Sequence, residues 1–175
     1  MSGRVLLRPP EHADAAEFTA RMKASRRHHA GWIAMPTTEA AFAVYVERNA
    51  SSSREMFLAC RRADGAIVGF FNIGEIIRGG LQQGFLGYGG VAEFAGQGYM
   101  TEGMQLVLGQ AFGPLKLHRL EANIQPGNTA SIALARRAGF VKEGFSERYL
   151  KVGGRWRDHE RWAIRAELWR ELRRS

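Results

Sequence analysis

The 175-residue chain is 45% hydrophobic and 24% charged, which is the balance of an ordinary globular domain. It carries 25 Lys and Arg against 17 Asp and Glu, so its net charge of +8 favours a polyanionic partner or cofactor. The longest nearly unbroken apolar stretch, residues 66–73, is far shorter than the ~20 residues that cross a membrane, and the first residues lack an apolar secretory segment. We therefore expect one cytoplasmic domain over residues 1–175, without membrane association.

The chain contains one cysteine, Cys60, which falls in an alternating strand pattern. A lone cysteine cannot form an internal disulfide, so we interpret Cys60 as a buried structural thiol. The sequence also lacks the residue spacing of a metal site, and no metal is expected.

The first half of the chain predicts, in order, a strand at residues 4–9, a helix at 11–27, a second helix within 31–50 and two strands within 54–73. Phe18 and Met22 share one face of the first helix, and Thr37 or Thr38 introduces the second. Asp64-Gly65 separates the two strands, and this dipeptide supplies the positive φ angles that a tight hairpin turn requires.

The second half predicts a strand at residues 82–91, a helix at 98–113, a strand at 117–126, a short helix from Asn128 to Gly139 and a hairpin closed by Gly153-Gly154. A strand, a crossover helix and another strand form a βαβ unit, whose two strands are normally parallel. The loop that opens the crossover helix then lies at the carboxyl end of the first strand. Open α/β sheets bind their ligands at this position.

That loop belongs to the segment VAEFAGQGYMTEG, residues 91–103. It is not a nucleoside triphosphate loop of the Lys-Ser/Thr type, because Tyr99 and Met100 follow its last glycine. A glycine loop at a helix start nevertheless presents backbone N–H groups without intrahelical partners, and these groups suit an anion. From the loop alone, an anion site and a plain structural turn are supported about equally.

Four segments share a pattern with a known family. In chain order they are SRRHHAGW, AGQGYMTEG, QPGNTASIALARRAGFVKEGF and GGRWRDHERWAI. Together they resemble the GCN5-related N-acetyltransferase (GNAT) superfamily, and within it the RimJ/RimL-type branch, which acetylates ribosomal-protein N-termini. The resemblance implies an α/β (α+β) GNAT fold. In this fold a mixed sheet of about seven strands, mostly antiparallel with one splayed parallel pair, is flanked by about four helices.

The resemblance implies acetyl-CoA as the co-substrate. The implied acetyl-CoA contacts are Val91, Gly96, Gln97, Gly98, Met100, Thr101, Asn128, Ser131 and Arg137. The backbone around Val91 would face the thioester, the glycine loop would surround the pyrophosphate, and Gly89-Gly90 would mark a bulge that helps the parallel strands to splay. By spacing alone, Asn128 is a helix cap and Ser131 adds a local bond, whereas the resemblance makes Asn128 a pantetheine contact.

The resemblance also indicates residues for the chemistry. Ser131 is the implied proton donor to the departing thiolate, and Tyr149 is a rival for this role. Glu121, on the second central strand, is the candidate for taking the amine proton, although a surface ion pair with Arg119 fits its position equally. The residues implied at the acceptor entrance are His28, His29 and Trp32. Arg136 and Arg137 would meet either the 3′-phosphate of CoA or solvent.

Two positions depart from the family pattern. Ala95 stands where the loop usually has Gln or Arg, and Arg148 stands where the branch often has an acid. Because the loop works through backbone N–H groups, Ala95 leaves pyrophosphate binding in place. Arg148 leaves the identity of the general base open.

We therefore expect an N-acetyltransferase that transfers acetyl from acetyl-CoA directly to a protein N-terminal amine in a ternary complex. Its basic surface would help it to approach the ribosome. The alternative among enzymes is acetylation of a small amine, such as an antibiotic, a polyamine or a metabolite. The alternative outside enzymes is a CoA- or RNA-binding protein without turnover, and homodimer formation stays open.

Overall fold

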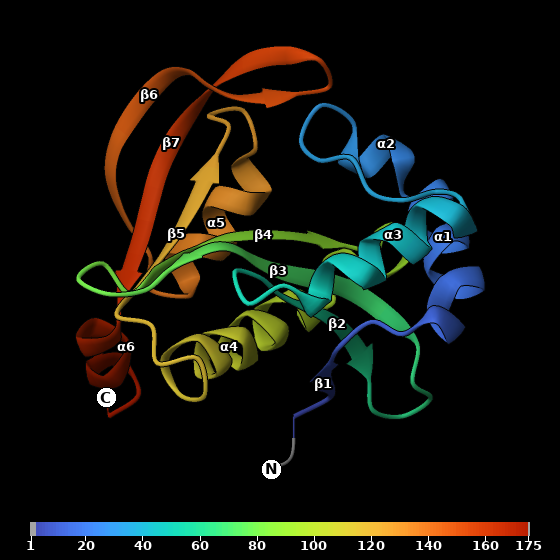
Figure 1. Cartoon of the computed structure of the whole chain (residues 1–175), viewed down its shortest axis with the longest axis horizontal. Helices are drawn as coiled ribbons and strands as arrows, with labels where there is room; N and C mark the ends of the chain where they lie inside the picture. Colours follow the sequence, from blue (N-terminus) through green and yellow to red (C-terminus); the bar gives the residue numbers. More distant parts are fainter. Residues whose placement is uncertain (1–2, 175) are drawn as a thin grey trace.

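Seven strands form one sheet in the order β1-β2-β3-β4-β5-β7-β6. The structure, a computed structural model, describes residues 3–174 (Figure 1). The strands are β1 (Val5–Arg8), β2 (Glu55–Arg61), β3 (Ile67–Ile77), β4 (Gln83–Gly90), β5 (Arg119–Ile124), β6 (Val141–Val152) and β7 (Arg155–Arg165). The helices are α1 (Ala15–Ala24), α2 (Arg26–His29), α3 (Glu39–Glu47), α4 (Tyr99–Phe112), α5 (Thr129–Arg137) and α6 (Ala166–Leu172). The expected mixed sheet is confirmed, and the helices beyond the expected four are the short α2 and α6.

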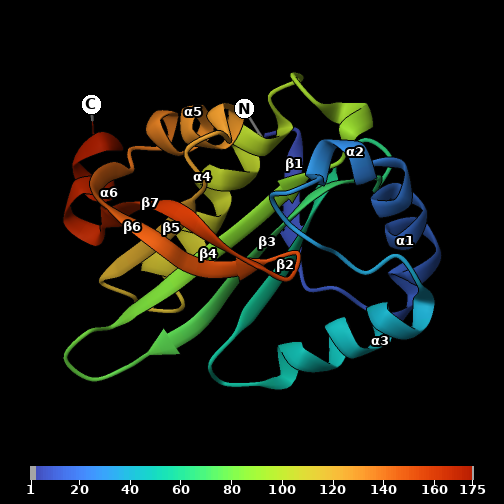
Figure 2. The ribbon, with the colours of Figure 1, turned by 90° about the horizontal axis from the view of Figure 1, so that it is seen from above.

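Two adjacent side chains of β3 show how the sheet is covered. Phe70 packs against Phe18 of α1 with ring centroids 6.2 Å apart, and Phe18 packs in turn against Phe42 of α3. Phe71 faces the opposite way, where a Cβ on Gly103 of α4 would lie 2.6 Å from its ring. Since successive strand side chains point to opposite faces, α1 and α3 cover one face and α4 covers the other (Figure 2). These four rings are fully buried, and truncating one to alanine would cost about 3–5 kcal/mol.

Ser25 divides the helix that was expected over residues 11–27. The structure has a 3-10 turn at His12–Asp14, then α1, then α2. Ser25 is fully buried, and its Oγ accepts a hydrogen bond from the Ala92 N–H at 3.0 Å. The break between α1 and α2 is therefore tied to the beginning of the glycine loop. In α3, the cap is Thr38, whose Oγ1 accepts from the Ala41 N–H.

The two predicted hairpin turns differ in geometry. Gly153 and Gly154 both have positive φ angles, 58° and 79°, as a tight two-residue turn requires. Between β2 and β3, Gly65 alone has a positive φ, while Asp64 accepts hydrogen bonds from the Arg61 side chain and the Ala66 N–H. The Arg61 N–H also donates to the Ala66 carbonyl, which closes a longer loop. The hairpin is confirmed, but the prediction that both turn residues have positive φ was wrong.

α5 begins and ends as the sequence indicates. Asn128 Oδ1 accepts from the Ser131 N–H at 3.2 Å, and Gly139 ends the helix with a φ of 95°. The sequence did not predict α6, because its apolar residues are held by tertiary contacts. Trp169 of α6 packs against Phe112 of α4 with ring centroids 5.4 Å apart.

β4 and β5 are the one parallel pair, and they pair only where they begin. Their register runs from Gln83 opposite Arg119 to Phe85 opposite Glu121. Beyond this point β4 continues to Gly90 beside β3, and β5 continues to Ile124 beside β7, but the two strands no longer pair with each other. The predicted splay is thus confirmed, and it opens a gap at the carboxyl ends of both strands.

The prediction of a bulge at Gly89-Gly90 was wrong. The register of β4 with β3 is regular there and shifts only between Gly74 and Ile77. A Cβ on Gly89 would lie 2.6 Å from the Phe70 ring, so close packing accounts for that glycine. The splay therefore comes from the end of pairing between β4 and β5.

Three further expectations concern single features of the chain. Cys60 is a buried free thiol, as expected. Among residues 3–174, no helix has the length and apolar character needed to cross a membrane. The same residues contain no cluster of three or more His, Cys, Asp or Glu side chains that could hold a metal ion.

Candidate active site

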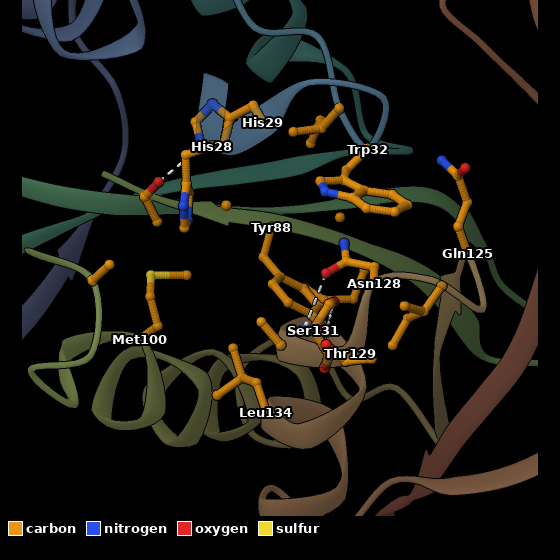
Figure 3. Close-up of a pocket in the computed structure, with 18 of the residues that line it drawn as sticks. His28, His29, Trp32, Tyr88, Met100, Gln125, Asn128, Thr129, Ser131 and Leu134 are labelled. Carbon is orange, nitrogen blue, oxygen red and sulfur yellow. Dashed lines mark hydrogen bonds between the residues drawn. The ribbon is translucent and has the colours of Figure 1, made fainter. Parts of the chain in front are cut away.

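A cavity of about 660 Å³ opens where β4 and β5 diverge. Its walls come from α2 and the loop after it, the end of β4, the glycine loop with the start of α4, the end of β5 with α5, and the β6–β7 hairpin. Figure 3 shows His28 and His29 on one side, Met100 on another, and Tyr88 projecting from β4 toward Ser131 on α5. Segments from both halves of the chain therefore meet in one site.

The β4 edge directs backbone groups into the gap. Val91 lines the cavity, but its N–H donates to the Val68 carbonyl at 2.9 Å. Because the backbone groups of an antiparallel strand alternate in direction, those of Gly90 and Tyr88 point away from β3 and toward the gap. The Gly90 carbonyl indeed meets His29 Nε2 at 2.8 Å. In the backbone around Val91, which is expected to face the thioester, the groups of Val91 itself are already bonded, and the free N–H groups are those of Gly90 and Tyr88.

The glycine loop forms a cluster of unpaired N–H groups. Gly96 and Gly98 have φ angles of 75° and 84°, which turn the backbone toward the cavity before α4 begins. Within residues 3–174, the N–H groups of Gly96, Gly98, Tyr99 and Met100 have no hydrogen-bond acceptor. Several adjacent donors at a helix start make an anion-binding concavity, and the spacing of this cluster suits a diphosphate. The geometry thus favours the anion site over the plain turn.

Gln97 does not share in this cluster. Its N–H donates to the Phe94 carbonyl, and its side-chain amide donates to the Glu93 carbonyl at 3.1 Å. Its carbonyl accepts from Arg4 on the side of β1. The structure therefore turns Gln97 away from the cavity, in contrast to its expected role as a CoA contact.

The other predicted residues of this region line the cavity. Met100 and Thr101 are both in its wall. A Cβ on Gly90 would lie 3.1 Å from Met100 Cγ, so the Met100 side chain covers the end of β4 closely. Arg137 also lines the cavity, whereas Arg136 stacks over the Trp162 ring at 5.3 Å. Of the two arginines, Arg137 is the one placed to meet a ligand.

Three side chains connect β4 with α5 inside the cavity. Ser131 Oγ donates to Tyr88 Oη at 2.7 Å, and Tyr88 Oη donates to the Ser131 carbonyl at 3.2 Å (Figure 3). Asn128 holds the same turn by accepting from the Ser131 N–H. Burial raises the pKa of Tyr88 to about 12, although the bond from Ser131 opposes this. Both hydroxyls are therefore neutral near pH 7 and able to donate a proton.

α2 and the loop after it supply the opposite wall through the three residues predicted for the acceptor entrance. His28 and His29 of α2 and Trp32 of the loop all line the cavity. Burial lowers the pKa of His29, and neighbouring His28 lowers it further, while the bond to the Gly90 carbonyl raises it. A carbonyl can only accept a hydrogen bond, so the neutral His29 imidazole carries its proton on Nε2, and its Nδ1 is unprotonated.

Two predicted catalytic residues lie elsewhere. Glu121 is the last residue of β5 paired with β4, and its Oε1 accepts from Arg119 Nε at 2.8 Å. Arg119 also binds Glu143, so Glu121 belongs to a surface ion network outside the cavity wall. Tyr149 packs against the His159 ring at 6.3 Å and is likewise outside the wall. The surface ion pair is thus the alternative that the geometry favours for Glu121.

Sequence reasoning missed several lining residues. Asn123 lines the cavity, and its Oδ1 is buried without a hydrogen-bond partner among the described residues. His159 is buried in the same wall, and its Nδ1 donates to the Arg157 carbonyl at 2.9 Å. Strand alternation places Asn123 on the face of Glu121 but one step further along, beyond the end of pairing. That alternation was the available signal for Asn123.

Comparisons with known proteins agree with this geometry. A family model described as an acetyltransferase (GNAT) domain matches residues 4–141. The probable N-acetyltransferase YjcK of Bacillus subtilis is 39% identical over 120 residues, which are 69% of this chain and 66% of that protein. The ribosomal protein uS5-alanine N-acetyltransferase of Escherichia coli is 34% identical over 103 residues, 59% of this chain and 53% of that protein. The chain therefore matches between about half and two-thirds of the length of these curated relatives.

Solved structures extend the comparison. Mycobacterium smegmatis RimJ in complex with CoA-disulfide superposes with a TM-score of 0.86 at 31% identity, covering 93% of this chain and 82% of that one. A spermidine N-acetyltransferase SpeG chimera from Vibrio cholerae and hSSAT superposes with a TM-score of 0.80 at 17% identity, covering 95% and 98%. At that lower identity the second likeness shows the fold alone.

Proposed function

Because the chain belongs to the GNAT acetyltransferase family, we propose that it is an N-acetyltransferase that takes acetyl from acetyl-CoA and transfers it to a protein N-terminal amine. One observation carries this proposal. A single cavity is lined by a cluster of unpaired N–H groups, here called the diphosphate end, by an unpaired strand edge, and by neutral side chains of α2, the loop after it, β5 and β7, here called the acceptor end. A diphosphate, a thioester and an amine need these three environments within reach of one another.

The diphosphate end binds through backbone groups. The free N–H groups of Gly96, Gly98, Tyr99 and Met100 would donate to the pyrophosphate, and Arg137 lies on the same side of α5 as the cavity. Because these donors are main-chain atoms, Ala95 in place of Gln or Arg does not remove any of them. Acetyl-CoA supplies the thioester carbon that the amine attacks.

The middle of the cavity would stabilise the charge that develops on the thioester oxygen. The N–H groups of Gly90 and Tyr88 point into the gap because β5 no longer pairs with β4 there. Fixed donors aimed at developing charge contribute several kcal/mol to a lowered barrier in acyl transfer. His29 holds the strand end in place by donating to the Gly90 carbonyl.

The hydroxyl pair of Ser131 and Tyr88 would protonate the departing thiolate. In the ligand-free arrangement Ser131 Oγ donates to Tyr88 Oη, and Tyr88 Oη donates to the Ser131 carbonyl. When the Ser131 hydroxyl rotates to give its proton to the thiolate, the Tyr88 hydroxyl can turn to Ser131 Oγ, 2.7 Å away, and replace that proton. Tyr149, the rival donor, lies outside the cavity wall. The pair therefore supports Ser131 as the donor and adds Tyr88 as its proton partner.

The acceptor end favours a protein N-terminus over a polyamine. All lining residues within the described chain are neutral or basic, among them His28, Trp32, Asn123 and His159. A polyamine carries several positive charges and binds best where carboxylates face it. A peptide N-terminus carries one amine that must be neutral to react, and the imidazole and amide groups of this wall suit it.

A panel of acceptors tests the proposal. Release of the CoA thiol would be followed with acetyl-CoA and short peptides with free N-termini, with the same peptides blocked at the N-terminus, and with spermidine. We expect turnover on the free peptides, none on the blocked ones and at most slow turnover on spermidine. Turnover on spermidine alone would replace the proposal with a small-amine acetyltransferase, and binding of CoA without any turnover would leave a CoA-binding protein.

A further inference from the structure

The tip of the β6–β7 hairpin carries its charges on two distinct sides. Leu150 and Val152 of β6 line the cavity, and their cross-strand partners are Arg157 and Arg155 of β7. Directly opposed residues of an antiparallel pair point to the same face, so both arginines share the cavity side of the hairpin. His159, two residues after Arg157, lines the cavity and confirms this direction.

The acids of this hairpin segment lie on the other side. Asp158 and Glu160 alternate with the two arginines along β7 and therefore face away from the cavity. Asp158 accepts from the Arg148 N–H, and Glu160 is paired with Lys142 and hydrogen-bonded to Trp162. The positive charge on the cavity side thus has no acid of β7 beside it.

A second pair of arginines lies on the helix that forms another wall of the cavity. Arg26 and Arg27 begin α2, the helix that also supplies His28 and His29 to the wall. In Figures 1 and 2 the loop after α2 passes beside the tip of the β6–β7 hairpin, and Trp32 of that loop lines the cavity together with Leu150. Unpaired basic residues are therefore present on α2 and on the hairpin, the two elements that approach each other beside the cavity.

These four guanidinium groups are unpaired. Within residues 3–174, Arg26, Arg27, Arg155 and Arg157 have no carboxylate partner. Arg157 Nε is in addition buried and lacks any hydrogen-bond acceptor. Because Nε of Arg157 is itself buried, a carboxylate would reach this arginine through its terminal nitrogens, and no described acid is paired with them.

From this arrangement we infer that the acceptor is a polypeptide with acidic side chains shortly after its N-terminal residue, and that Arg155 and Arg157, on the cavity side of the hairpin, bind those carboxylates. The inference rests on the proposed function and names its substrate class. The N-terminal amine enters the cavity, whereas the two arginines lie beside its wall and outside it. The acidic residues that they bind are therefore in the part of the peptide that lies just outside the cavity.

Arginine suits this role because its planar fork binds a carboxylate through two parallel hydrogen bonds. Recognition of acidic segments by arginine clusters is a recurring way to select peptides. The position at a cavity mouth favours a peptide over a nucleic acid, because a chain that places its end in the cavity must pass between these elements.

Matched peptides would test the inference. Three peptides share their first residues and carry Glu, Gln or Lys at the following positions. At low salt we expect the Glu peptide to have a KM about tenfold below that of the Gln peptide, with the same kcat, and the Lys peptide to have the highest KM. Salt should weaken the preference, because the contacts lie near solvent.

Two variants with the same change of charge separate the role of the hairpin from net charge. In the double variant Arg155→Gln/Arg157→Gln, the Glu and Gln peptides should have equal KM values, while the KM for acetyl-CoA stays unchanged. The double variant Arg170→Gln/Arg174→Gln, at the exposed C-terminal end of the described chain on and just after α6 and far from the hairpin tip, should keep the full preference (Figure 1).

The outcomes distinguish this inference from the proposed function. Equal KM values for the three peptides would overturn the inference and leave N-terminal acetylation standing. Turnover on small amines alone would overturn the proposed function itself. A short RNA that competes with the Gln peptide in the native enzyme, but not in the double variant, would assign the arginines to nucleic acid and would also overturn the inference.

Discussion

The two ends of the cavity are built in different ways. At the diphosphate end, the donors are backbone N–H groups of one continuous segment, Gly96 to Met100, and two positive φ angles with one helix start determine their positions. At the acceptor end, the groups are side chains of α2, β5 and β7, which meet only through the order of the strands. An anion site can therefore be a local property of the chain, whereas an acceptor site is a tertiary one.

The hydroxyl pair lies where the two ends meet, and its removal should have the largest effect. Ser131→Ala removes the proton donor, and we expect kcat to fall about 10²- to 10³-fold while the KM values for acetyl-CoA and peptide change less than about twofold. Tyr88→Phe should lower kcat in the same direction, because it breaks the 2.7 Å contact with Ser131 Oγ. Steady-state kinetics with each substrate varied in turn would measure both.

Tyr149→Phe serves as the control for the hydroxyl pair. Tyr149 lies outside the cavity wall, so its variant should keep the native kcat. Native turnover in Ser131→Ala together with a large loss in Tyr149→Phe would reverse the assignment of the proton donor.

The diphosphate end can be disturbed without touching the acceptor end. Gly98 has a φ of 84° and precedes α4, so Gly98→Ala strains the turn and shifts the N–H groups that follow it, those of Tyr99 and Met100. We expect the KM for acetyl-CoA to rise on the order of 10- to 100-fold while the KM for peptide stays the same. Gly79→Ala is the matched control, because Gly79 has a φ of 70° in the β3–β4 loop and imposes the same strain. A similar change of KM in both variants would attribute the effect to general destabilisation.

At the acceptor end, a substitution should lower activity while it stabilises the protein. Asn123 Oδ1 is buried without a partner, and we expect the acceptor amine to donate to it. Asn123→Leu removes this unsatisfied acceptor, so the free energy of unfolding should rise by about 1 kcal/mol, while the KM for peptide rises about tenfold. Denaturant unfolding and peptide kinetics would measure the two effects. A rise of the acetyl-CoA KM in place of the peptide KM would assign Asn123 to the diphosphate end.

The same contrast explains what could be predicted from the sequence. The cap at Asn128, the end of α5 at Gly139 and the turn of the glycine loop depend on residues within one or two turns of each other. The structure has the cap, the helix end and the positive φ angles of Gly96 and Gly98. Glu121 and Asn123 are two residues apart on one strand, and only the point where β5 stops pairing with β4 decides which of them lines the cavity. No local pattern contains that information.

The sequence also did not predict the direction in which individual side chains point. Gln97 lies inside the predicted loop, yet its amide bonds back to Glu93, because the turn at Gly96 and Gly98 directs the backbone rather than the side chains toward the cavity. His159 and Tyr88 could not be assigned to the site for a related reason. Their strands were predicted, and so were the parallel pair and the closing hairpin. The pairing of β5 with β7 and the residue at which β4 and β5 separate were not.

His29 joins the acceptor wall to the strand edge, and its titration provides the smallest effect. Burial lowers its pKa below the ordinary 6.5, so the unfolded chain binds the proton more readily than the folded one. Stability should therefore be complete above about pH 6.5 and should decrease as the pH falls from 6.5 toward the lowered pKa of the folded state. In His29→Gln this part of the pH dependence should disappear, and the free energy of unfolding at about pH 7.5 should change by about 1 kcal/mol or less, because glutamine can still donate to Gly90.

Denaturant midpoints at about pH 7.5 and about pH 5.5 would measure this pH dependence, with the exposed His12→Gln as control. If His12→Gln removed the pH dependence and His29→Gln kept it, the imidazole at the strand edge would not be the group held neutral by folding.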